Sequence, residues 1–340
     1  MTPTGWLLIY IALAAVVVFL AIKLSNYVDL LDKKTKLSGA LLGGILLAAV
    51  TSLPELFTSL TGTIAIQNNQ LVLGNIMGSD FFDIVIFGVV YILFFKGLVE
   101  KRLGKQHYYT IFFTFAMVVA VTCAAFVFHN NGWLIGGYFN PMSFAIIAIY
   151  AVSVWKTPKT EEKEEKEEDK SKLTVKQIWI LFAICSALLI GASIGVTYVT
   201  DEVVNGFKIG ATFGGSLFLG VATSLPEVTA TIALCKKKNF NAAFGDIFGS
   251  CVFNIIILAI ADALSFKAGP LYGIDTSSFL LIVGTAFALL VALISIIFIR
   301  SKKFDFDIKS RIILIIFAVL LIGSYITYLA LYSSGFVINF

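Results

Sequence analysis

A glutamate that directly follows a proline occurs twice inside long apolar stretches of this sequence. Residues 51–55 and residues 223–227 both read Thr-Ser-Leu-Pro-Glu. A glycine-rich segment follows each copy, Gly-Asn-Ile-Met-Gly-Ser at 74–79 and Gly-Asp-Ile-Phe-Gly-Ser at 245–250. The glutamate precedes the last serine of that segment by 24 positions in the first half and by 23 in the second. The agreement in letters and spacing predicts an internal repeat that carries polar chemistry.

Each proline should leave one backbone carbonyl without its helical partner. Proline has no N–H and its ring clashes with the carbonyl four residues back, which belongs to Val50 in the first copy and to Ala222 in the second. In a bilayer such a carbonyl must find a partner in the protein or line a cavity. Thr51 and Glu55 are four residues apart and face the same side of a helix, and Thr223 and Glu227 repeat this spacing. Two intramembrane glutamates at matching positions therefore favour a functional site over two simple proline kinks.

Oxygen-bearing side chains form a stripe along each glycine-rich segment. Asn75, Ser79 and Asp83 are four residues apart and share one helical face. The second half repeats the stripe with Asn and Asp exchanged, as Asp246, Ser250 and Asn254. The glycines one position before the first two stripe residues form Gly-x-x-x-Gly pairs, which let helix backbones approach closely. We therefore expect each stripe to pack against the bent proline-containing regions.

The combined candidate set contains only oxygen ligands: Glu55, Glu227, Asp83, Asp246, Asn75, Asn254, Ser52, Ser79, Ser224, Ser250, Thr51 and Thr223. Carboxylate-rich oxygen coordination suits hard cations such as Ca²⁺ and Na⁺. Four neighbouring carboxylates cannot all stay charged and unpaired, so cations or protons must neutralise them. Asp80, one position off the stripe, and Asp262, further along, remain candidates for a supporting or proton-bearing role.

Other ligand chemistries find little support in the sequence. Both histidines, His107 and His129, lie near the ends of apolar segments, and the four cysteines have no metal-like spacing. We therefore expect no histidine relay, no thiolate metal site and no disulfide framework.

The composition is that of a polytopic membrane protein. Hydrophobic residues make up 59% of the chain and charged residues 14%, with a mean hydropathy of +0.93, whereas soluble domains carry about 25% charged residues. No basic segment precedes Trp6, so the first apolar run is expected to be a retained helix and not a signal peptide. We expect no nucleic-acid partner and no cofactor.

Ten apolar runs are long enough to span a bilayer, since a span needs about 20 apolar residues. They cover residues 6–24, 37–66, 70–95, 108–128, 133–155, 177–200, 207–235, 240–265, 277–299 and 310–333. Every odd-numbered run is followed by at least three Lys or Arg residues, and every even-numbered run by at most one. Because cytoplasmic loops collect Lys and Arg, this alternation predicts both termini on the extracytoplasmic side.

Ten spans divide into two halves of five, so the second half would cross the membrane in the opposite sense. The predicted fold is therefore all-α, with ten transmembrane helices in two inverted five-helix repeats and a site near the midplane. The first repeat is placed at 1–156 with its motif region at about 40–95, the charged cytoplasmic linker at 157–175, and the second repeat at 176–340 with its motif region at about 210–265. Alternating Glu and Lys residues indicate a solvated linker, not a folded domain.

The paired motifs resemble the α-repeats of the cation/Ca²⁺ exchanger superfamily, and most of all its sodium/calcium exchanger branch, including prokaryotic members. The H⁺/Ca²⁺ exchanger branch carries a different acidic motif that contains Gly-Asn-Ala. The resemblance implies that Glu55 and Glu227 are the central Ca²⁺ ligands and that the first and sixth helices slide to alternate access. It also implies flanking oxygens for Na⁺ and Ca²⁺ from Thr51, Ser52, Ser79, Thr223, Ser224, Ser250 and the freed carbonyls near Val50 and Ala222.

Asp83 and Asn254 match a further polar position of that family, four residues after the serine. Their order, Asp in the first half and Asn in the second, is the reverse of that in some relatives. Val50 and Ala222 also stand where the family commonly has Gly. The resemblance therefore leaves the ion stoichiometry and any K⁺ dependence open.

The predicted function is secondary antiport of Na⁺ and Ca²⁺ by alternating access, with Ca²⁺/H⁺ or K⁺-dependent Ca²⁺/cation exchange as the alternative. The expected partners are Ca²⁺ and Na⁺ ions and the lipid bilayer of a prokaryotic plasma membrane, with the chain acting as a monomer and not as an enzyme. An intramembrane aspartyl protease is disfavoured because Ala-Phe-Gly precedes Asp246 where Gly-x-Gly is needed. A passive channel is not excluded, although carboxylates favour binding over fast release.

Overall fold

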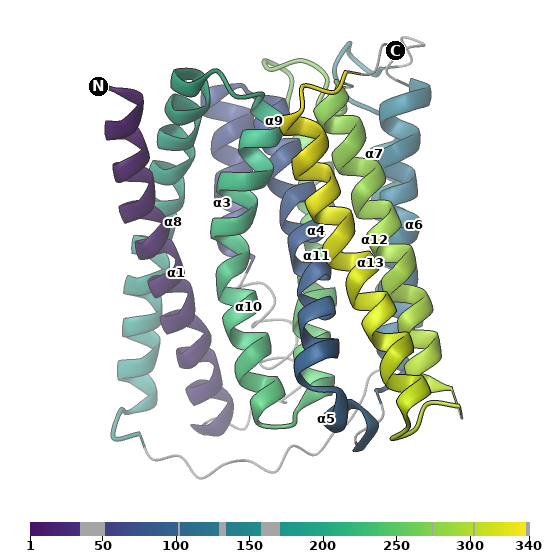
Figure 1. Cartoon of the computed structure of the whole chain (residues 1–340). Helices are drawn as coiled ribbons and strands as arrows, with labels where there is room; N and C mark the ends of the chain where they lie inside the picture. The colour runs from purple at the N-terminus through teal and green to yellow at the C-terminus, as the bar shows by residue number, and fades with distance from the viewer. Residues whose placement is uncertain are drawn as a thin grey trace.

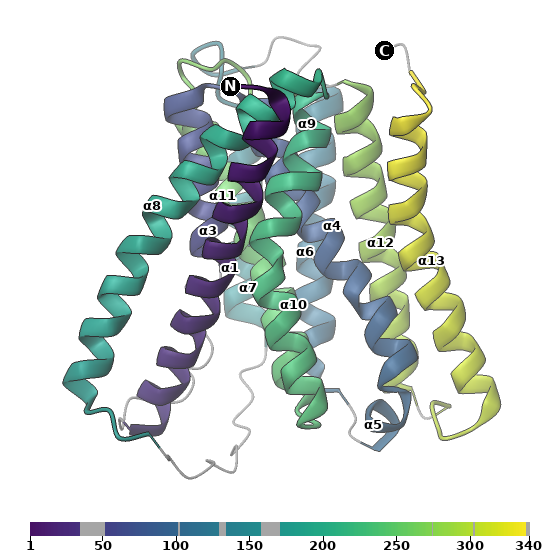
Figure 2. The ribbon, with the colours of Figure 1, turned by 60° about the vertical axis from the view of Figure 1, so that its left-hand side comes forward.

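The computed structural model is a bundle of helices (Figure 1), with α1 (Pro3–Lys34) toward one side and α13 (Ile308–Ser333) at the other in the turned view (Figure 2). The structure describes residues 1–34, 52–100, 103–128, 134–157, 171–273, 275–301 and 303–337. Eight helical stretches in this part of the chain are long and apolar enough to cross a membrane. The shorter helix α7 (Met142–Lys156) and the helical residues 53–66 account for the fifth and second predicted runs. The prediction of an all-helical membrane protein is confirmed.

The two repeats run in opposite directions through the bundle. Helix α4 (Asn69–Leu93) continues into the short helix α5 (Phe95–Glu100), and α10 (Val221–Lys236) leads into α11 (Phe240–Leu264). The carboxylate of Glu100, at the end of α5, lies 3.0 Å from the ammonium group of Lys238, just before α11 begins. The end of α4 and the start of α11 therefore lie at the same end of the bundle, and the two helices are antiparallel (Figure 1). This is the inversion that the sequence predicts.

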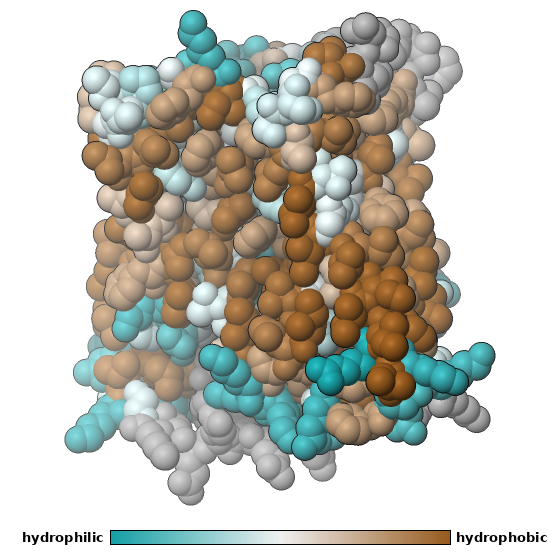
Figure 3. Space-filling view, viewed as in Figure 1, coloured by the Kyte–Doolittle hydropathy of each residue, from teal (hydrophilic) through white to brown (hydrophobic). Residues whose placement is uncertain are grey.

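The helices that carry the oxygen stripes form the centre of the bundle. In the most apolar 18-residue stretch of each helix, 78% of α4 and 67% of α11 is buried inside the bundle. The corresponding share is only 22% in α1, α13 and α8 (Val175–Phe207). Helices α6 (Lys105–Cys123) and α12 (Thr276–Arg300) cover the central pair together with α13. The polar stripes are thus shielded by helices whose own apolar side chains form the broad hydrophobic belt in Figure 3.

Helices α1 and α8 form a long pair beside this centre. They contain 32 and 33 residues, which corresponds to about 50 Å at 1.5 Å per residue and exceeds a hydrocarbon core of about 30 Å. Both helices slant across the bundle (Figure 2). Their contact is apolar, with Val17, Leu24 and Val28 of α1 in one cluster with Leu189 and Val196 of α8. The two helices therefore pack against each other mainly through apolar side chains.

The lysine-rich turns gather at one end of the molecule. The ends of α1, α5, α10 and α12 lie at the lower end in Figure 1, and hydrophilic side chains collect there in Figure 3. Helix α1 begins and α13 ends at the opposite end. The alternation of basic residues along the sequence therefore corresponds to a real separation in space.

Three details differ from the sequence prediction or lie beyond it. The fifth span begins at Met142 and not near residue 133, because Gly136 and Gly137 adopt positive φ angles in a turn before Pro141. The linker at 157–175 falls largely on residues outside the described part. The repeat boundaries at 156 and 176 stay a prediction.

Candidate functional site

The two copies of the repeated motif differ in backbone shape. Helix α3 (Leu53–Leu60) begins at the motif, with Pro54 in its first turn and Ser52 just before it. Helix α10 instead continues through Pro226, so the carbonyl of Ala222 cannot receive a bond from residue 226. Val50 and Thr51 lie outside the described residues, so their predicted roles stay predictions. Different local shapes mean that the two halves would offer different backbone oxygens to an ion.

Both motif glutamates are buried in the centre of the bundle. Glu55 and Glu227 are each only 1% exposed. Neither carboxylate oxygen of Glu227 accepts a hydrogen bond within the described structure, and the same holds for one oxygen of Glu55. Burying an unpaired carboxylate is costly, so these two groups require a cation or a proton.

Asn75 joins the stripe of α4 to α3. Its side-chain amide donates to the hydroxyl of Thr58 at 2.8 Å and to the hydroxyl of Ser59 at 3.2 Å. The Thr58 hydroxyl in turn donates to the carbonyls of Pro54 and Glu55. The amide of Asn75 thus fixes the helical turn that carries Glu55, while its own carbonyl oxygen remains without a hydrogen bond.

Ser79 connects the first repeat to the second. Its hydroxyl lies 3.2 Å from the carbonyl oxygen of Gly220 and 3.2 Å from the hydroxyl of Thr223. Gly220 ends the π-helical segment η4 (Gly215–Gly220), which precedes α10. The stripe of α4 therefore packs against the proline-containing region of the opposite repeat, as the glycine pattern predicts.

Asp80 makes a further hydrogen bond between the two repeats. The side-chain amide of Asn254 on α11 donates to Asp80 Oδ1 at 3.0 Å, and both residues are buried. Asp80 thus faces the second stripe although it lies one position off the first. Asp83, four residues after Ser79, is also buried, and one of its carboxylate oxygens accepts no hydrogen bond from the described residues.

The buried carboxylates interact electrostatically across the repeat interface. Asp83 experiences the charges of Glu55, Asp80 and Asp246, and Glu227 experiences those of Glu55, Asp83 and Asp246. These five acidic side chains are thus linked by repulsion between neighbours in an apolar bundle. Like charges in a low-dielectric interior repel strongly, so cations or protons must compensate them.

Ten buried oxygens from both repeats have no hydrogen-bond partner within the described structure. They belong to Ser52, Glu55, Asn75, Asp80, Asp83, Ser224, Asp246, Asn254 and, with two oxygens, Glu227. Most buried polar atoms in proteins are hydrogen-bonded, so this concentration of free acceptors indicates a place where an external ligand supplies the missing interactions.

The arrangement differs from that of a resident metal site. In the described part of the chain, no group of three or more His, Cys, Asp or Glu side chains is placed to hold one metal ion. A cation here would be held by one or two carboxylates together with hydroxyl, amide and backbone oxygens. Such mixed ligation suits hard cations and suits ions that must also leave.

The remaining predicted residues share this region but differ in their contacts. Asp246 is 7% exposed, and one of its oxygens lacks a partner among the described residues. The hydroxyl of Ser250 donates to the carbonyl of Ile247 at 2.9 Å, one turn back on its own helix. The Ser224 hydroxyl is fully buried. The ligand roles of all these residues stay predictions.

The sequence argument missed Thr58, Ser59 and the Gly220 carbonyl. Thr58 follows Glu55 by three residues, so its place on the same helical face was available from the spacing alone. Ser59 and the Gly220 carbonyl become visible only when α3, α4 and η4 are assembled, because spacing within one helix does not identify the neighbouring helix.

Asp262 lies outside the site. It is eight residues beyond Asn254 on α11, about 12 Å along the helix. Its Oδ2 accepts the N–H of Asn140 at 3.0 Å and the hydroxyl of Ser143 at 2.7 Å. The Ser143 hydroxyl also lies 3.0 Å from that of Tyr272. Asp262 therefore anchors the first turn of α7 to α11.

We expect Asp262→Ala to destabilise the protein by about 1–3 kcal/mol, because it leaves buried donors without an acceptor. Asp262→Asn retains an acceptor oxygen and should cost less. Thermal unfolding in detergent micelles measures both effects. If Asp262→Ala unfolded at the same temperature as the parent protein, Asp262 would not be the anchor of α7.

Comparison with known proteins agrees with this arrangement. A family model described as "Sodium/calcium exchanger protein" matches residues 5–156 and 177–333. No curated protein sequence matches the chain.

Several solved structures share the fold. The H⁺/Ca²⁺ exchanger CAX is 16% identical with a TM-score of 0.63, covering 99% of this chain and 90% of that one. The structure of YfkE is 14% identical with a TM-score of 0.64, covering 96% and 92%. The sodium-calcium exchanger NCX_Mj, soaked with Na⁺ and Sr²⁺, is 16% identical with a TM-score of 0.58, covering 96% and 97%. At these identities the likeness concerns the fold alone.

Proposed function

Since this chain belongs to the sodium/calcium exchanger protein family, we propose that it is an antiporter that exchanges Na⁺ for Ca²⁺ across a membrane. The observation that carries the proposal is the set of ten unpartnered buried oxygens, drawn from both repeats and centred on Glu55 and Glu227. Hydroxyl, amide and carboxylate oxygens are the ligands that both ions accept. One set of oxygens would therefore serve both ions in turn.

Charge explains why the two ion movements would be coupled. Without cations, the five buried carboxyl groups at positions 55, 80, 83, 227 and 246 would hold unpaired charge inside the bilayer, which is costly. If the carrier reorients only when this charge is compensated, it cannot return empty after it releases Ca²⁺. It must then return with Na⁺ bound, so the two ion movements are coupled. We expect the apolar α1–α8 pair to slide during this reorientation.

One observation favours Ca²⁺/H⁺ exchange as a second candidate. A single Ca²⁺ compensates two of the five carboxyl charges, so three must be covered by monovalent cations or protons. The Asp80 carboxyl is fully buried beside Asn254, on a helix that carries neither motif glutamate, which suits a group that carries a proton. The experiment must therefore distinguish Na⁺ from H⁺ as the coupling ion.

The lysine-rich end would face the cytoplasm, and both termini would then lie outside a prokaryotic plasma membrane. The protein would act as a monomer without a cofactor, and its ligands would be the transported ions.

The coupling ion can be identified in proteoliposomes that are loaded with Na⁺, with K⁺ or with acid and diluted into buffer with ⁴⁵Ca²⁺ and none of the loaded ion. We expect Ca²⁺ uptake only when the outward gradient is one of Na⁺. Uptake driven by the acid interior alone would replace the proposal with Ca²⁺/H⁺ exchange. Uptake that requires K⁺ would identify a K⁺-dependent exchanger.

A further inference from the structure

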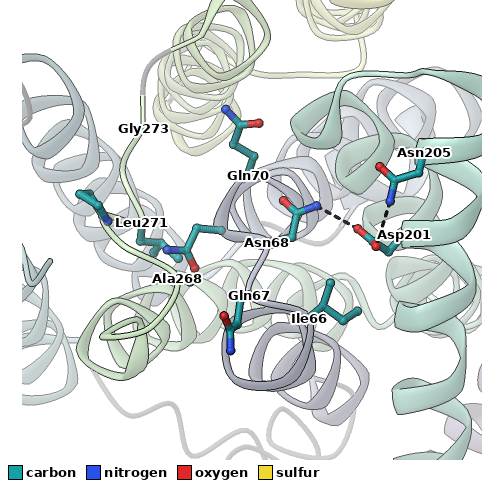
Figure 4. Close-up of a pocket in the computed structure, with 11 residues that line it drawn as sticks. Ile66, Gln67, Asn68, Gln70, Asp201, Asn205, Ala268, Leu271 and Gly273 are labelled. Carbon is teal, nitrogen blue, oxygen red and sulfur yellow. Dashed lines mark hydrogen bonds between the residues drawn. The ribbon is translucent and has the colours of Figure 1, made fainter.

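A polar pocket opens at the end of the bundle opposite the lysine-rich end. Its volume is about 430 Å³, and it lies among the C-terminal end of the π-helical segment η2 (Thr61–Ile66), the start of α4, the end of α8 and the loop after α11. Figure 4 shows Asn68 and Asn205 directed toward Asp201 from two different elements. No residue of this pocket belongs to the central site described above.

The pocket is lined by one carboxylate and five amides. These are Asp201 and the side chains of Gln67, Asn68, Asn69, Gln70 and Asn205. No Lys or Arg is among its lining residues, and Asp201 has no ion pair within the described structure. A carboxylate that has no ion pair attracts cations and repels anions.

The carboxylate of Asp201 is held in a fixed orientation. Its Oδ1 accepts the Asn68 amide at 2.9 Å, and its Oδ2 accepts the Asn205 amide at 3.1 Å. Each carboxylate oxygen can accept more than one hydrogen bond or metal contact, so both retain capacity. The dipole at the start of α4 would disfavour a cation, but the Asn68 side chain caps this end by accepting the N–H of Leu71.

A second observation points to a ligand in the same pocket. Asn69 is only 7% exposed, and its amide nitrogen donates to the carbonyl of Gly269 at 2.8 Å. Its Oδ1 is buried and accepts no hydrogen bond from the described residues. Asn69 thus gives the lining of this pocket a buried amide oxygen without a hydrogen-bond donor. Because buried acceptors are almost always satisfied, this oxygen indicates a missing ligand.

Buried hydroxyls continue from the pocket toward Glu55. Ser193, Thr197 and Thr200 lie on the face of α8 that also carries Asp201, and all three are buried. This helix contacts α3 and η2, which join Glu55 to the pocket along the chain. The hydroxyl oxygens of Ser193 and Thr200, and that of Thr63 on η2, have no partner among the described residues.

We propose that this pocket is a capture site for a hydrated divalent cation on its way to the buried glutamates. The inference rests on the proposed cation transport, since it names the place where the ion is collected before it is dehydrated. The amides would contact the water shell of the ion, and Asp201 would supply the charge.

Two variants distinguish an effect of the pocket on Ca²⁺ uptake from an effect of surface charge in general. Asp201→Asn removes the carboxylate charge inside the pocket, and Glu202→Gln removes the same charge from the next residue, which is exposed and does not line the pocket. In vesicles at low ionic strength, we expect Asp201→Asn to raise the Ca²⁺ concentration for half-maximal uptake from the pocket side by roughly tenfold. The maximal rate should persist, the effect should shrink with added salt, and Glu202→Gln should behave like the parent protein.

Direct binding separates this inference from the proposed function. Mn²⁺ binding to the purified full chain, followed by electron paramagnetic resonance, requires no transport. We expect Glu55→Gln/Glu227→Gln to retain one weak Mn²⁺ site that Asp201→Asn removes and Glu202→Gln leaves intact. If the double variant does not fold, the same pair is compared in the parent chain, where Asp201→Asn should lower the number of bound Mn²⁺ ions by one.

Equal Mn²⁺ binding by the Asp201→Asn and Glu202→Gln proteins would overturn the capture site. Loss of the site in Asp201→Asn alone would support it, even if the vesicle experiments showed that Na⁺ does not drive Ca²⁺ uptake. The failure of one proposal is therefore distinguishable from the failure of the other.

Discussion

Replacing either motif glutamate, by Glu55→Gln or by Glu227→Gln, is expected to abolish Ca²⁺ transport while the protein still folds. Each side chain is buried and offers at least one oxygen without a hydrogen-bond partner in the described structure. Loss of one charged partner from a buried ionic contact costs about 2–5 kcal/mol, which corresponds to roughly 30-fold to several thousandfold in affinity. Glutamine has nearly the same shape and removes a buried charge, so folding should not suffer.

The matched control is Glu202→Gln, which removes one charge from the exposed side of α8. Uptake of ⁴⁵Ca²⁺ into Na⁺-loaded proteoliposomes measures transport, and thermal unfolding in micelles verifies the fold. Exchange with an unchanged Ca²⁺ affinity in either glutamine variant would show that the repeated motif does not form the ion site.

The second large effect is expected from Gly74→Ala, which should prevent stable folding where α4 crosses the short helix α9 (Ala211–Gly214) and the adjoining segment η4. A Cβ atom at Gly74 would lie 2.1 Å from the carbonyl oxygen of Thr212, and one at Gly215 would lie 2.3 Å from that of Leu71. Both obstacles are backbone atoms, so no side chain can move aside to make room. Overpacking costs about 1–3 kcal/mol or more, and separating these elements would also displace Ser79 from Thr223.

Thermal unfolding of Gly74→Ala should be compared with that of Gly191→Ala. Gly191 is exposed on α8 and an added Cβ there meets no atom within 4 Å. Because alanine favours helices over glycine by up to about 1 kcal/mol, the control should be as stable as the parent or more so. Similar unfolding temperatures for the two variants would contradict the close crossing.

The sequence predicts the architecture well because both halves contain the same five-residue motif, Thr-Ser-Leu-Pro-Glu. Two identical proline-glutamate motifs in oppositely oriented halves specify which segments must meet at the pseudo-symmetry axis. The number of Lys and Arg residues was compared between whole loops, so no single position decides the result. The alternation therefore identifies which loops lie at the same end of the bundle. The central position of α4 and α11 follows from their polar stripes, which must be kept from lipid.

The partner of Asp80 could not be predicted in the same way. One residue along a helix corresponds to a rotation of about 100°, which removes Asp80 from the stripe of Ser79 and Asp83. Whether the side chain then faces lipid or another helix depends on the packing of α11. Only the assembled bundle shows that Asn254 occupies this direction.

The glycine pattern illustrates a second limit. Both halves carry Gly-x-x-x-Gly, but of these four glycines only Gly74 and Gly78 lie against backbone atoms of another segment. An added Cβ at Gly249 meets nothing within 4 Å, and one at Gly245 would lie 3.7 Å from the ring of His107. The residues that correspond to η4 in the first half lie outside the described ranges. A Gly-x-x-x-Gly motif allows two helix backbones to approach closely. Whether they do depends on which segment packs against the glycines.

The most direct test of the account is competition between Na⁺ and Ca²⁺ for the purified protein at equilibrium. The central claim is that one set of oxygens around Glu55 and Glu227 binds both ions. Ca²⁺ binding should be measured at constant ionic strength while Na⁺ replaces K⁺. We predict that Na⁺ displaces Ca²⁺ cooperatively, that K⁺ does not, and that Glu55→Gln abolishes the Ca²⁺ signal. Equal displacement by Na⁺ and K⁺, or Ca²⁺ binding that persists in Glu55→Gln, would contradict the account.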